Sequence, residues 1–280
     1  MKTCIRLEIF KLTRKLRSYL GFGALAAMAG LVVLGLARGR PPFEASFEQG
    51  FVTVGSYLNG GFVAWFLLRM VMMFFLPVFA CVVVGDMISG EAADGTLRAV
   101  LSRPVGRGSL FVAKFAVSVL YVIALTLFLG VAAYAVGAIF LGRGALATFQ
   151  EGTMLGAQGI YIYNEGEGLV RLLGAYGFAS VAVLSVATIA FFLSSVLTNS
   201  LGAIGGAMMT FILFGVVGAI DYFKPIHPYL FTTHMDSWRG LFLTPVPWGQ
   251  VVKSLGILLA YISVFFAAGL AVFRRKDVLS

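Results

Sequence analysis

The chain contains six runs of apolar residues, each long enough to cross a lipid bilayer as one helix. A helical span needs about 20 residues, whereas the strands of a membrane barrel give only short alternating runs. With 60% hydrophobic and 12% charged residues, the chain lacks the polar surface of a soluble protein of 280 residues. These features predict an all-α integral membrane protein with a single transmembrane domain over residues 1–280. The expected spans are Ser18–Ala37, Phe62–Val84, Phe115–Leu141, Leu169–Leu193, Leu201–Ile220 and Val251–Phe273.

The lysines and arginines between the spans predict the orientation of the chain. Twelve of them lie on the side that holds both termini, and five lie on the opposite side. Because cytoplasmic loops are enriched in basic residues, both termini are expected in the cytoplasm. The predicted location is the cell (inner, cytoplasmic) membrane, which the chain crosses several times. The net charge of +9 then reports topology, and no nucleic-acid partner is expected.

Residues 1–17 predict an amphipathic helix that lies in the membrane surface. Apolar residues recur there and at the start of the first span at helical intervals: Ile5, Ile9, Leu12, Leu16 and Leu20. The basic residues fall on the other sides of the helix: Arg6, Lys11, Arg14 and Lys15. Such a helix turns its basic face toward anionic lipid or a cytoplasmic partner. The alternative is a basic segment that merely orients the first span.

Two of the loops on the outer side have a distinctive composition. The loop 142–168 contains three glutamates and several glycines, and it is expected to be flexible and acidic. The loop 221–250 is rich in aromatic residues and in prolines, which predicts a re-entrant or interfacial structure. Its two histidines, His227 and His234, lie near Asp236, but their spacing matches no established ligand pattern. No metal site is therefore expected, and the histidines are predicted to be interfacial or solvated.

Four basic residues fall within or beside the predicted spans. Lys114, Arg171 and Lys253 lie near helix ends, where a long side chain can reach water. Arg69 lies deeper in the second span, so it either lines a polar cavity or extends to the outer interface. The predicted spans contain no Asp or Glu. This composition counts against a proton-coupled carrier, because proton relays in membranes use buried carboxylates.

The second predicted span is rich in Met and Phe, which form adaptable apolar surfaces. The span could line a route for an apolar substrate, or it could simply face lipid. Pro77 is expected to kink this span near its cytoplasmic half.

Residues 85–108 form a polar island between two long apolar runs, and they are expected outside the bilayer as a cytoplasmic loop. Within the island, Leu97–Ser102 predicts a short helix that ends before Pro104. Glu91 and Asp94 lie near its amino-terminal end, where the helix dipole favours acids. A short helix parallel to the membrane can transmit a movement from a soluble partner. The alternative is a solvated hairpin without a partner.

The island resembles the signature of the ABC-2-type transporter permeases, the membrane subunits of ATP-binding-cassette exporters. The resemblance rests on Gly90-Glu91, Gly95-Thr96-Leu97, the run Leu101–Val105, Arg107 and Lys114. The tail Phe273–Asp277 resembles the usual end of that family. The basic leader, the six spans and the cytoplasmic termini agree with it as well, so the resemblance covers essentially the whole chain.

The resemblance implies that this chain is a permease without enzymatic activity, and nothing in it matches a P-loop. Two copies of a separate cytoplasmic ATPase would bind ATP and Mg²⁺, and a second permease, identical or different, would complete the transporter. The island would be the coupling helix that docks on the ATPase, through Glu91, Asp94, Gly95, Thr96, Leu97, Arg98, Leu101, Arg103, Pro104 and Arg107.

The same resemblance implies that the second and fifth spans line the path between two permeases. The candidate path residues are Phe66, Arg69, Met70, Met73, Met208, Met209 and Phe211. No large outer domain is predicted, which favours direct translocation of a substrate. The alternatives are an ATP-independent secondary carrier or channel, and a membrane anchor for a cytoplasmic complex.

Overall fold

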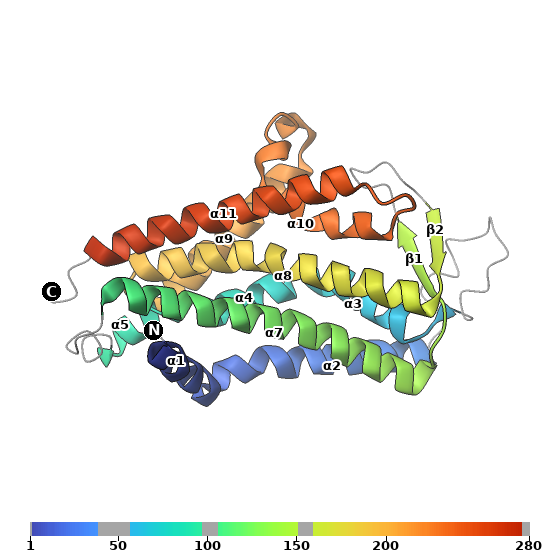
Figure 1. Ribbon diagram of the computed structural model, residues 1–280, viewed down its shortest axis with the longest axis horizontal. Helices are drawn as coiled ribbons and strands as arrows, with labels where there is room; N and C mark the ends of the chain where they lie inside the picture. Colours follow the sequence, from blue (N-terminus) through green and yellow to red (C-terminus); the bar gives the residue numbers. More distant parts are fainter. Residues whose placement is uncertain (1, 39–56, 97–105, 151–158, 276–280) are drawn as a thin grey trace.

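The computed structural model describes residues 2–38, 57–96, 106–150 and 159–275, which form an elongated helical bundle. The bundle begins with α1 (Lys2–Arg14) and α2 (Leu16–Arg38), and it ends with α11 (Trp248–Arg275). Figure 1 shows that α1 and the carboxyl-terminal end of α11 lie at the same end of the bundle, which we call the terminal end. The opposite end carries a two-stranded hairpin and is called the hairpin end. α1 is seen almost along its axis, so it lies across the direction of the long helices (Figure 1).

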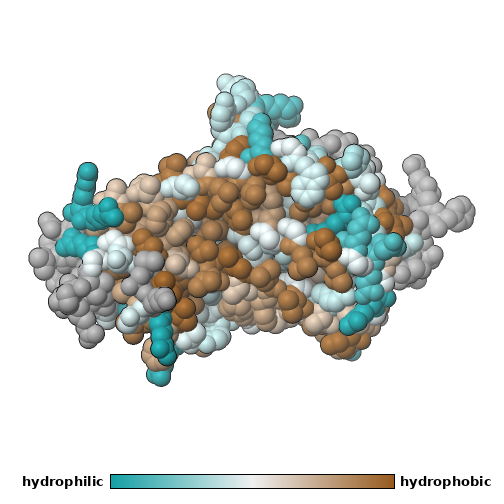
Figure 2. Space-filling model, viewed as in Figure 1, coloured by the Kyte–Doolittle hydropathy of each residue, from teal (hydrophilic) through white to brown (hydrophobic). Residues whose placement is uncertain are grey.

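Six described helical segments are long and apolar enough to cross a membrane, which confirms the expected class of multi-pass membrane protein. They are α2, the segment Phe75–Ala93, α7 (Arg107–Leu141), α8 (Glu165–Val196), α9 (Ser200–Ala219) and α11. In Figure 2 apolar residues cover the middle of the visible face, and hydrophilic residues gather nearer its two ends. This distribution is the one that a bilayer around the middle of the bundle requires.

The second predicted span consists of two helices, α3 (Gly60–Met72) and α4 (Phe75–Val84), with a break at Met73 and Phe74. Pro77 lies in the first turn of α4 and has no backbone N–H to donate to the Met73 carbonyl, while its ring crowds that carbonyl. The kink expected at Pro77 is therefore displaced to the residues one turn before it. After α4, the chain turns into the short helix α5 (Ser89–Ala93).

α8 runs through the middle of the bundle and packs against α3, α4, α7, α9 and α11. α3 and α7, which both pack on α8, approach each other so closely that only glycine fits between them at one point. A Cβ atom on Gly137 would lie 2.8 Å from the Gly60 Cα atom and 3.0 Å from the Val63 side chain. This contact fixes the hairpin-end half of the second span against α7.

The loop 142–168 is not simply flexible, because it contains an antiparallel hairpin. β1 (Leu146–Gln150) pairs with β2 (Gly159–Tyr163), with Leu146 opposite Tyr163. Ile160, Tyr161, Ile162 and Tyr163 have high strand propensity, and this signal was readable in the sequence. The prediction of an all-α fold is thus right for the membrane spans and wrong for this short hairpin.

Residues 221–247 connect α9 to α11; residues 221–229 stand out from the side of the bundle, and the rest fold back against it (Figure 1). They form η3 (Asp221–Phe223), η4 (His227–Tyr229), α10 (Phe231–Met235) and η5 (Asp236–Phe242), of which η3, η4 and η5 are 3₁₀-helices. Phe231, Trp238 and Phe242 are fully buried, so these aromatic residues are core residues instead of interfacial ones. The chain then returns beside α9. This is seen from Phe231 of α10 and Phe214 of α9, whose ring centroids are 5.4 Å apart.

The two histidines of this region are buried, which corrects the expectation that they are interfacial or solvated. His234 lies 2.9 Å from the Ser254 hydroxyl through Nδ1 and 2.8 Å from the Pro228 carbonyl through Nε2. His227 Nε2 lies 3.2 Å from the Val217 carbonyl in the last turn of α9. Asp236 pairs with Arg239 at 3.5 Å. These contacts hold α10 and the adjoining turns in place.

The close approach of α3 and α7 predicts the effect of adding one methyl group. Gly137→Ala should destabilise the protein by about 1–3 kcal/mol, because the new Cβ atom forces the two helices apart. The matched control is Gly30→Ala in α2, where a Cβ atom meets nothing within 4 Å. Thermal unfolding in detergent should show a lower Tm for Gly137→Ala alone. An unchanged Tm for Gly137→Ala would contradict the tight contact.

Candidate functional site

The centre of the candidate site is the ammonium group of Lys114, which is completely buried near the start of α7. Lys114 Nζ lies 2.8 Å from Glu8 Oε2 and 2.9 Å from Glu91 Oε2, and it donates a hydrogen bond to the Met87 carbonyl at 3.1 Å. The expectation that Lys114 reaches water along its stem is wrong. Its side chain points inward because α1 supplies Glu8 as a buried partner from across the site.

Lys11 completes this group of charges from the same helix as Glu8. Its Nζ atom lies 2.9 Å from Glu91 Oε1 and 3.3 Å from Glu8 Oε1. Burial lowers the pKa of Lys11, but the adjacent carboxylates of Glu91 and Glu8 outweigh that effect and raise its pKa above the ordinary value. Lys11 therefore stays charged at neutral pH, and Glu91 is paired with two cations.

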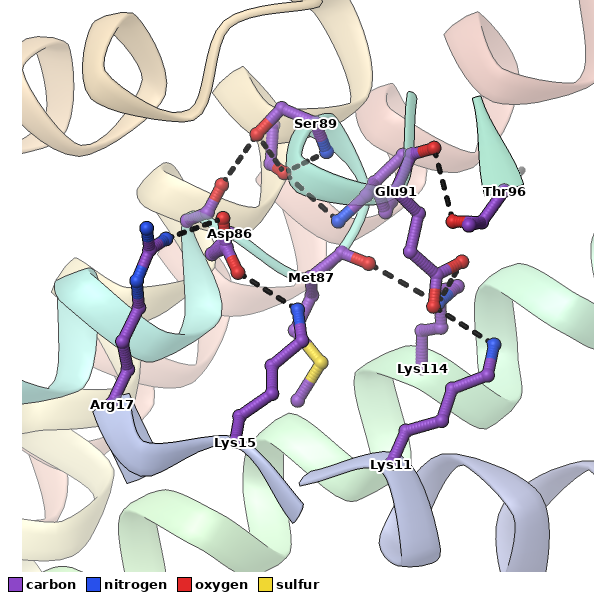
Figure 3. A network of polar contacts seen from close by, with 12 residues as sticks. Lys11, Lys15, Arg17, Asp86, Met87, Ser89, Glu91, Thr96 and Lys114 are labelled. Atoms are coloured by element: carbon purple, nitrogen blue, oxygen red, sulfur yellow. Dashed lines mark hydrogen bonds and ion pairs between the residues drawn. The ribbon is translucent and has the colours of Figure 1, made fainter. Parts of the chain in front are cut away.

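A second group of charges forms around Asp86, in the turn between α4 and α5. Lys15 Nζ lies 2.9 Å from Asp86 Oδ2, and Arg17 Nη1 lies 3.1 Å from Asp86 Oδ1. Figure 3 shows Lys11, Lys15 and Arg17 extending from α1 and the start of α2 toward Asp86 and Glu91. We call the whole set the charged cluster. Its members are Glu8, Lys11, Lys15, Arg17, Asp86, Glu91 and Lys114.

Two serines fasten α5 to the centre of the bundle beside the charged cluster. The Ser194 hydroxyl oxygen in α8 accepts hydrogen bonds from the backbone N–H groups of Ile88 and Ser89, at 3.1 and 2.9 Å. It also bonds the Ser89 hydroxyl at 3.0 Å. These are the donors at the start of α5 that have no partner within their own helix. Ser194 thus caps α5 from another helix.

Gly90 is needed because the Asp86 carboxylate occupies the space of a side chain. A Cβ atom at Gly90 would overlap the Asp86 carboxyl carbon, at 2.7 Å, and its Oδ1 atom. The Gly-Glu pair of the predicted motif therefore has a physical reason. Gly90 leaves room for one carboxylate of the cluster, and Glu91 supplies another.

A small cavity of about 20 Å³ lies within the charged cluster, between the groups centred on Lys114 and Asp86. This volume is enough for about one water molecule. Ser18 contributes to its lining, and the Ser18 hydroxyl is buried without a hydrogen-bond partner among the described residues. No group of three or more His, Cys, Asp and Glu side chains within the described ranges could hold a metal ion.

The predicted docking residues divide into three groups. Glu91 was expected to contact an outside partner. It is buried and its carboxylate points inward to Lys114, so it is poorly placed for such a contact. Asp94, Gly95 and Thr96 are exposed, and Arg107 is half-buried. The remaining predicted residues lie outside the described residues: Leu97, Arg98, Leu101, Arg103 and Pro104.

The predicted basic face of the leader helix is split between the surface and the interior. Arg6 and Arg14 are exposed, whereas Lys11 and Lys15 turn inward to the charged cluster. The expected apolar face is also only partly buried, because Ile5 and Leu12 pack on the core while Ile9 is exposed. The reason is Glu8, which occupies the centre of the buried face and binds Lys114.

The candidate path residues lie on α3, α9 and the break after α3. Met70, Met73 and Met209 are exposed, and Phe66, Met208 and Phe211 are half-buried. Arg69 Nη1 bonds the Phe149 carbonyl of β1 at 3.4 Å, so its side chain extends toward the hairpin end. This contact favours the second of the two alternatives for Arg69. In the second span it is α4, which holds none of these candidate residues, that packs against α9.

Sequence reasoning missed Glu8, Asp86 and Ser194 as members of the site. It also found no carboxylate in the predicted spans, yet Asp86 and Glu91 are buried within the membrane-competent segment Phe75–Ala93. They were not counted among the residues of a span because the predicted span ends at Val84, before both, and Glu91 was expected in an exposed docking element instead. The available signal was an excess of basic residues in the leader together with three acids in the island: Asp86, Glu91 and Asp94.

Removal of the central cation should destabilise the protein strongly. Lys114→Met removes the buried cation shared by Glu8 and Glu91 and leaves these two carboxylates with Lys11 between them. Loss of one partner from a buried ion pair costs about 3–5 kcal/mol. The control Lys253→Met removes an exposed lysine of α11 and should change the Tm little. Thermal unfolding in detergent measures both variants. A similar Tm for the two would contradict the assignment of Lys114 as the centre of the cluster.

A double-mutant cycle can test the packing of Gly90 on Asp86. Gly90→Ala alone should lower the Tm, because the methyl group displaces the Asp86 carboxylate from Lys15 and Arg17. In an Asp86→Ala background the same substitution should have almost no further effect. Equal decreases in both backgrounds would show that Gly90 acts independently of Asp86.

Comparison with known proteins places the chain in a family. Residues 25–279 match the family model described as "Protein of unknown function (DUF2705)". The chain is also similar to the "Uncharacterized protein YhcI" of Bacillus subtilis (strain 168), with 25% identity over 213 residues. That match covers 72% of this chain and 64% of the relative, so the chain spans under two thirds of the relative's length. The extent of the family match shows that this protein belongs to the DUF2705 family.

Proposed function

We propose that this protein is the permease subunit of an ATP-binding-cassette exporter in the cytoplasmic membrane. The observation that carries the proposal is the charged cluster. It joins α1 to α5 and α7, the two helices that the island segment 94–107 connects. A movement of that segment would pass to three membrane-associated elements at once. The resemblance of the island and of the tail to ABC-2-type permeases supports the same function.

In this proposal the terminal end of the bundle faces the cytoplasm. α1 lies at the membrane surface, with Arg6 and Arg14 exposed toward anionic lipid, and α5 leads into the coupling segment. Two copies of a separate ATPase bind ATP and Mg²⁺ and dock on that segment. The permease itself carries out no hydrolysis.

The substrate path is proposed along α3, α4 and α9, between this chain and a second permease. The exposed side chains near the break in the second span are apolar: Met70, Met73, Phe74 and Phe75. An apolar substrate suits such a surface because Met and Phe adapt to irregular shapes. The break allows the halves α3 and α4 to move separately, and a kinked span near a path is a common feature of transporters.

A proton-driven carrier is the second candidate, and the buried carboxylates Glu8, Asp86 and Glu91 favour it. However, each carboxylate is paired with at least one cation, and all three lie near the terminal end of the bundle. A proton relay needs a carboxylate that can lose its partner along a transmembrane route. The paired arrangement suits a structural junction better.

Co-purification tests the proposed function. The tagged protein, extracted gently from its native membranes, should bring down a P-loop ATPase at about one ATPase per permease. Asp94→Lys and Arg98→Glu should reduce this recovery several-fold, because they reverse charge on the proposed docking segment. Glu165→Lys, at an exposed position of the hairpin end, is the matched control and should leave recovery unchanged.

The outcomes separate the two candidates. Recovery of the chain without any nucleotide-binding protein, as a stable and folded species, would contradict the exporter proposal. If proteoliposomes of the purified chain then dissipate a pH gradient in response to substrate, the carrier would be supported instead.

A further inference from the structure

The charged cluster carries one more positive charge than its acids neutralise. Its members are four cations and three acids. Around Lys114 two cations face two acids, so the charges there balance. Around Asp86 they do not, because Lys15 and Arg17 share this one carboxylate. The excess charge therefore lies at the junction of α1 and α2.

The two cations of the Asp86 group have more donors than this carboxylate can use. Arg17 Nη1 lies 3.1 Å from Asp86 Oδ1, and Lys15 Nζ lies 2.9 Å from Oδ2 (Figure 3). A guanidinium carries five N–H donors and an ammonium carries three. The side chains of Arg17 and Lys15 are 58% and 42% exposed, whereas that of Asp86 is 9% exposed. A ligand that approaches from outside thus meets the cations before the acid.

The small cavity beside these cations is also lined by the first turn of α2. Ser18, in that turn, is 4% exposed, and its hydroxyl has no hydrogen-bond partner among the described residues. The start of a helix presents N–H groups and the positive end of the helix dipole, and both favour an anion. α2 has no acidic residue in its first turn. The cavity therefore combines a hydroxyl, a helix N-terminus and two cations, a donor set that suits phosphate oxygens.

The surroundings of the cavity favour a lipid as the source of the phosphate. In the proposed orientation α1 lies at the surface of the cytoplasmic leaflet. α2 then continues with the exposed residues Tyr19 and Leu20, so lipid chains reach this helix within its first turns. Basic pockets between helices on the cytoplasmic side of a membrane bind anionic lipid head groups. A free phosphate ion offers the same oxygens, but it has no acyl chain to cover Tyr19 and Leu20.

We propose that the phosphate group of one anionic phospholipid binds between Lys15, Arg17 and the Ser18 hydroxyl, with its acyl chains along the exposed face of α2. One phosphate oxygen is about as large as a water molecule and fits the cavity of about 20 Å³. The other oxygens face the guanidinium, whose planar fork matches phosphate geometry. The lipid supplies the negative charge that the Asp86 group lacks.

This inference rests on the proposed function for the orientation of the terminal end, and it adds a regulator to the same junction. The bound lipid holds Lys15 and Arg17 beside Asp86, so it tightens the contact between the start of α2 and the turn before α5. Movement of the coupling segment then depends on the lipid composition of the membrane.

Lipid titration of the purified protein tests the site. Native mass spectrometry in detergent counts the bound lipids, and phosphatidylglycerol should bind as one tight equivalent, with phosphatidylcholine bound more weakly. Arg17→Gln should weaken the binding of phosphatidylglycerol about tenfold, because it removes hydrogen bonds from a charged donor. Arg6→Gln removes the same charge from an exposed position of α1 and is the matched control, which should leave the affinity unchanged.

Ser18→Ala separates a ligand site from a structural role. Since the hydroxyl has no partner in the described part of the chain, its loss should leave the Tm of the lipid-free protein unchanged. The rise in Tm on addition of phosphatidylglycerol should be smaller than in the wild type, because the lipid binds more weakly. The same rise in both proteins would show that Ser18 does not contact the lipid and would overturn the site. This variant also provides the test if Arg17→Gln fails to fold.

The remaining controls identify the ligand. Sodium phosphate at the same concentration should not raise the Tm as phosphatidylglycerol does, and an equal rise would show that a free anion occupies the site. Equal binding of phosphatidylcholine would also overturn the proposal. Equal weakening by Arg17→Gln and Arg6→Gln would do the same, because it would show only a general attraction to an anionic surface.

ATPase co-purification with the same variants distinguishes this inference from the proposed function. Selective lipid binding in a chain that recovers no ATPase would support the lipid site and contradict the exporter. ATPase recovery without selective lipid binding would retain the exporter and overturn the lipid site.

Discussion

The buried ammonium of Lys114 determines how the terminal end of this protein is built. A lysine taken fully out of water is unfavourable unless acids and hydrogen-bond acceptors replace the solvent around it. Glu8 and Glu91 supply the acids, and the Met87 carbonyl supplies a further acceptor. Because these partners come from α1, α5 and the preceding turn, satisfying one charge fixes three separate segments.

The need to neutralise Lys114 also explains why the buried face of α1 contains an acid, Glu8. A helix that only rested on a bilayer would bury an unbroken apolar face. Here the buried face carries Glu8 between Ile5 and Leu12, and Lys11 of the same helix binds Glu91 of the island. α1 is therefore attached to the protein by ion pairs, and its exposed side carries Arg6, Leu7 and Phe10. Under the proposed function, this attachment carries movement between the coupling segment and the membrane.

The protein places its polar and irregular elements where a bilayer permits them. The charged cluster lies at one end, the hairpin at the other, and the segment 230–243 is packed against α8 and α11. Residues 221–229 follow α9, whose 20 residues are enough to cross the bilayer, so this exposed segment also lies toward a membrane surface.

The sequence by itself determined the number of membrane-competent helices and, apart from the second, their approximate limits, because 20-residue apolar runs have few other stable arrangements in water or lipid. The first span, expected at Ser18–Ala37, forms α2 at Leu16–Arg38, and Pro77 correctly indicated a disruption of the second span. The hairpin could have been predicted from its alternating Ile and Tyr residues. The position of the break at Met73 and Phe74 was also readable in principle, since a proline at 77 leaves the carbonyl of residue 73 without its helical donor.

The charged cluster was decided by the tertiary structure alone. Glu8 and Lys114 are 106 residues apart, and Lys11 and Glu91 are 80 residues apart. No local pattern relates residues at such separations, and each of them has an ordinary alternative at the membrane surface. Only the folding of α1 across the start of α7 removes water from Lys114 and makes Glu8 its required partner. The apolar sequence thus determined where the helices lie, and burial in the folded chain decided which charges pair.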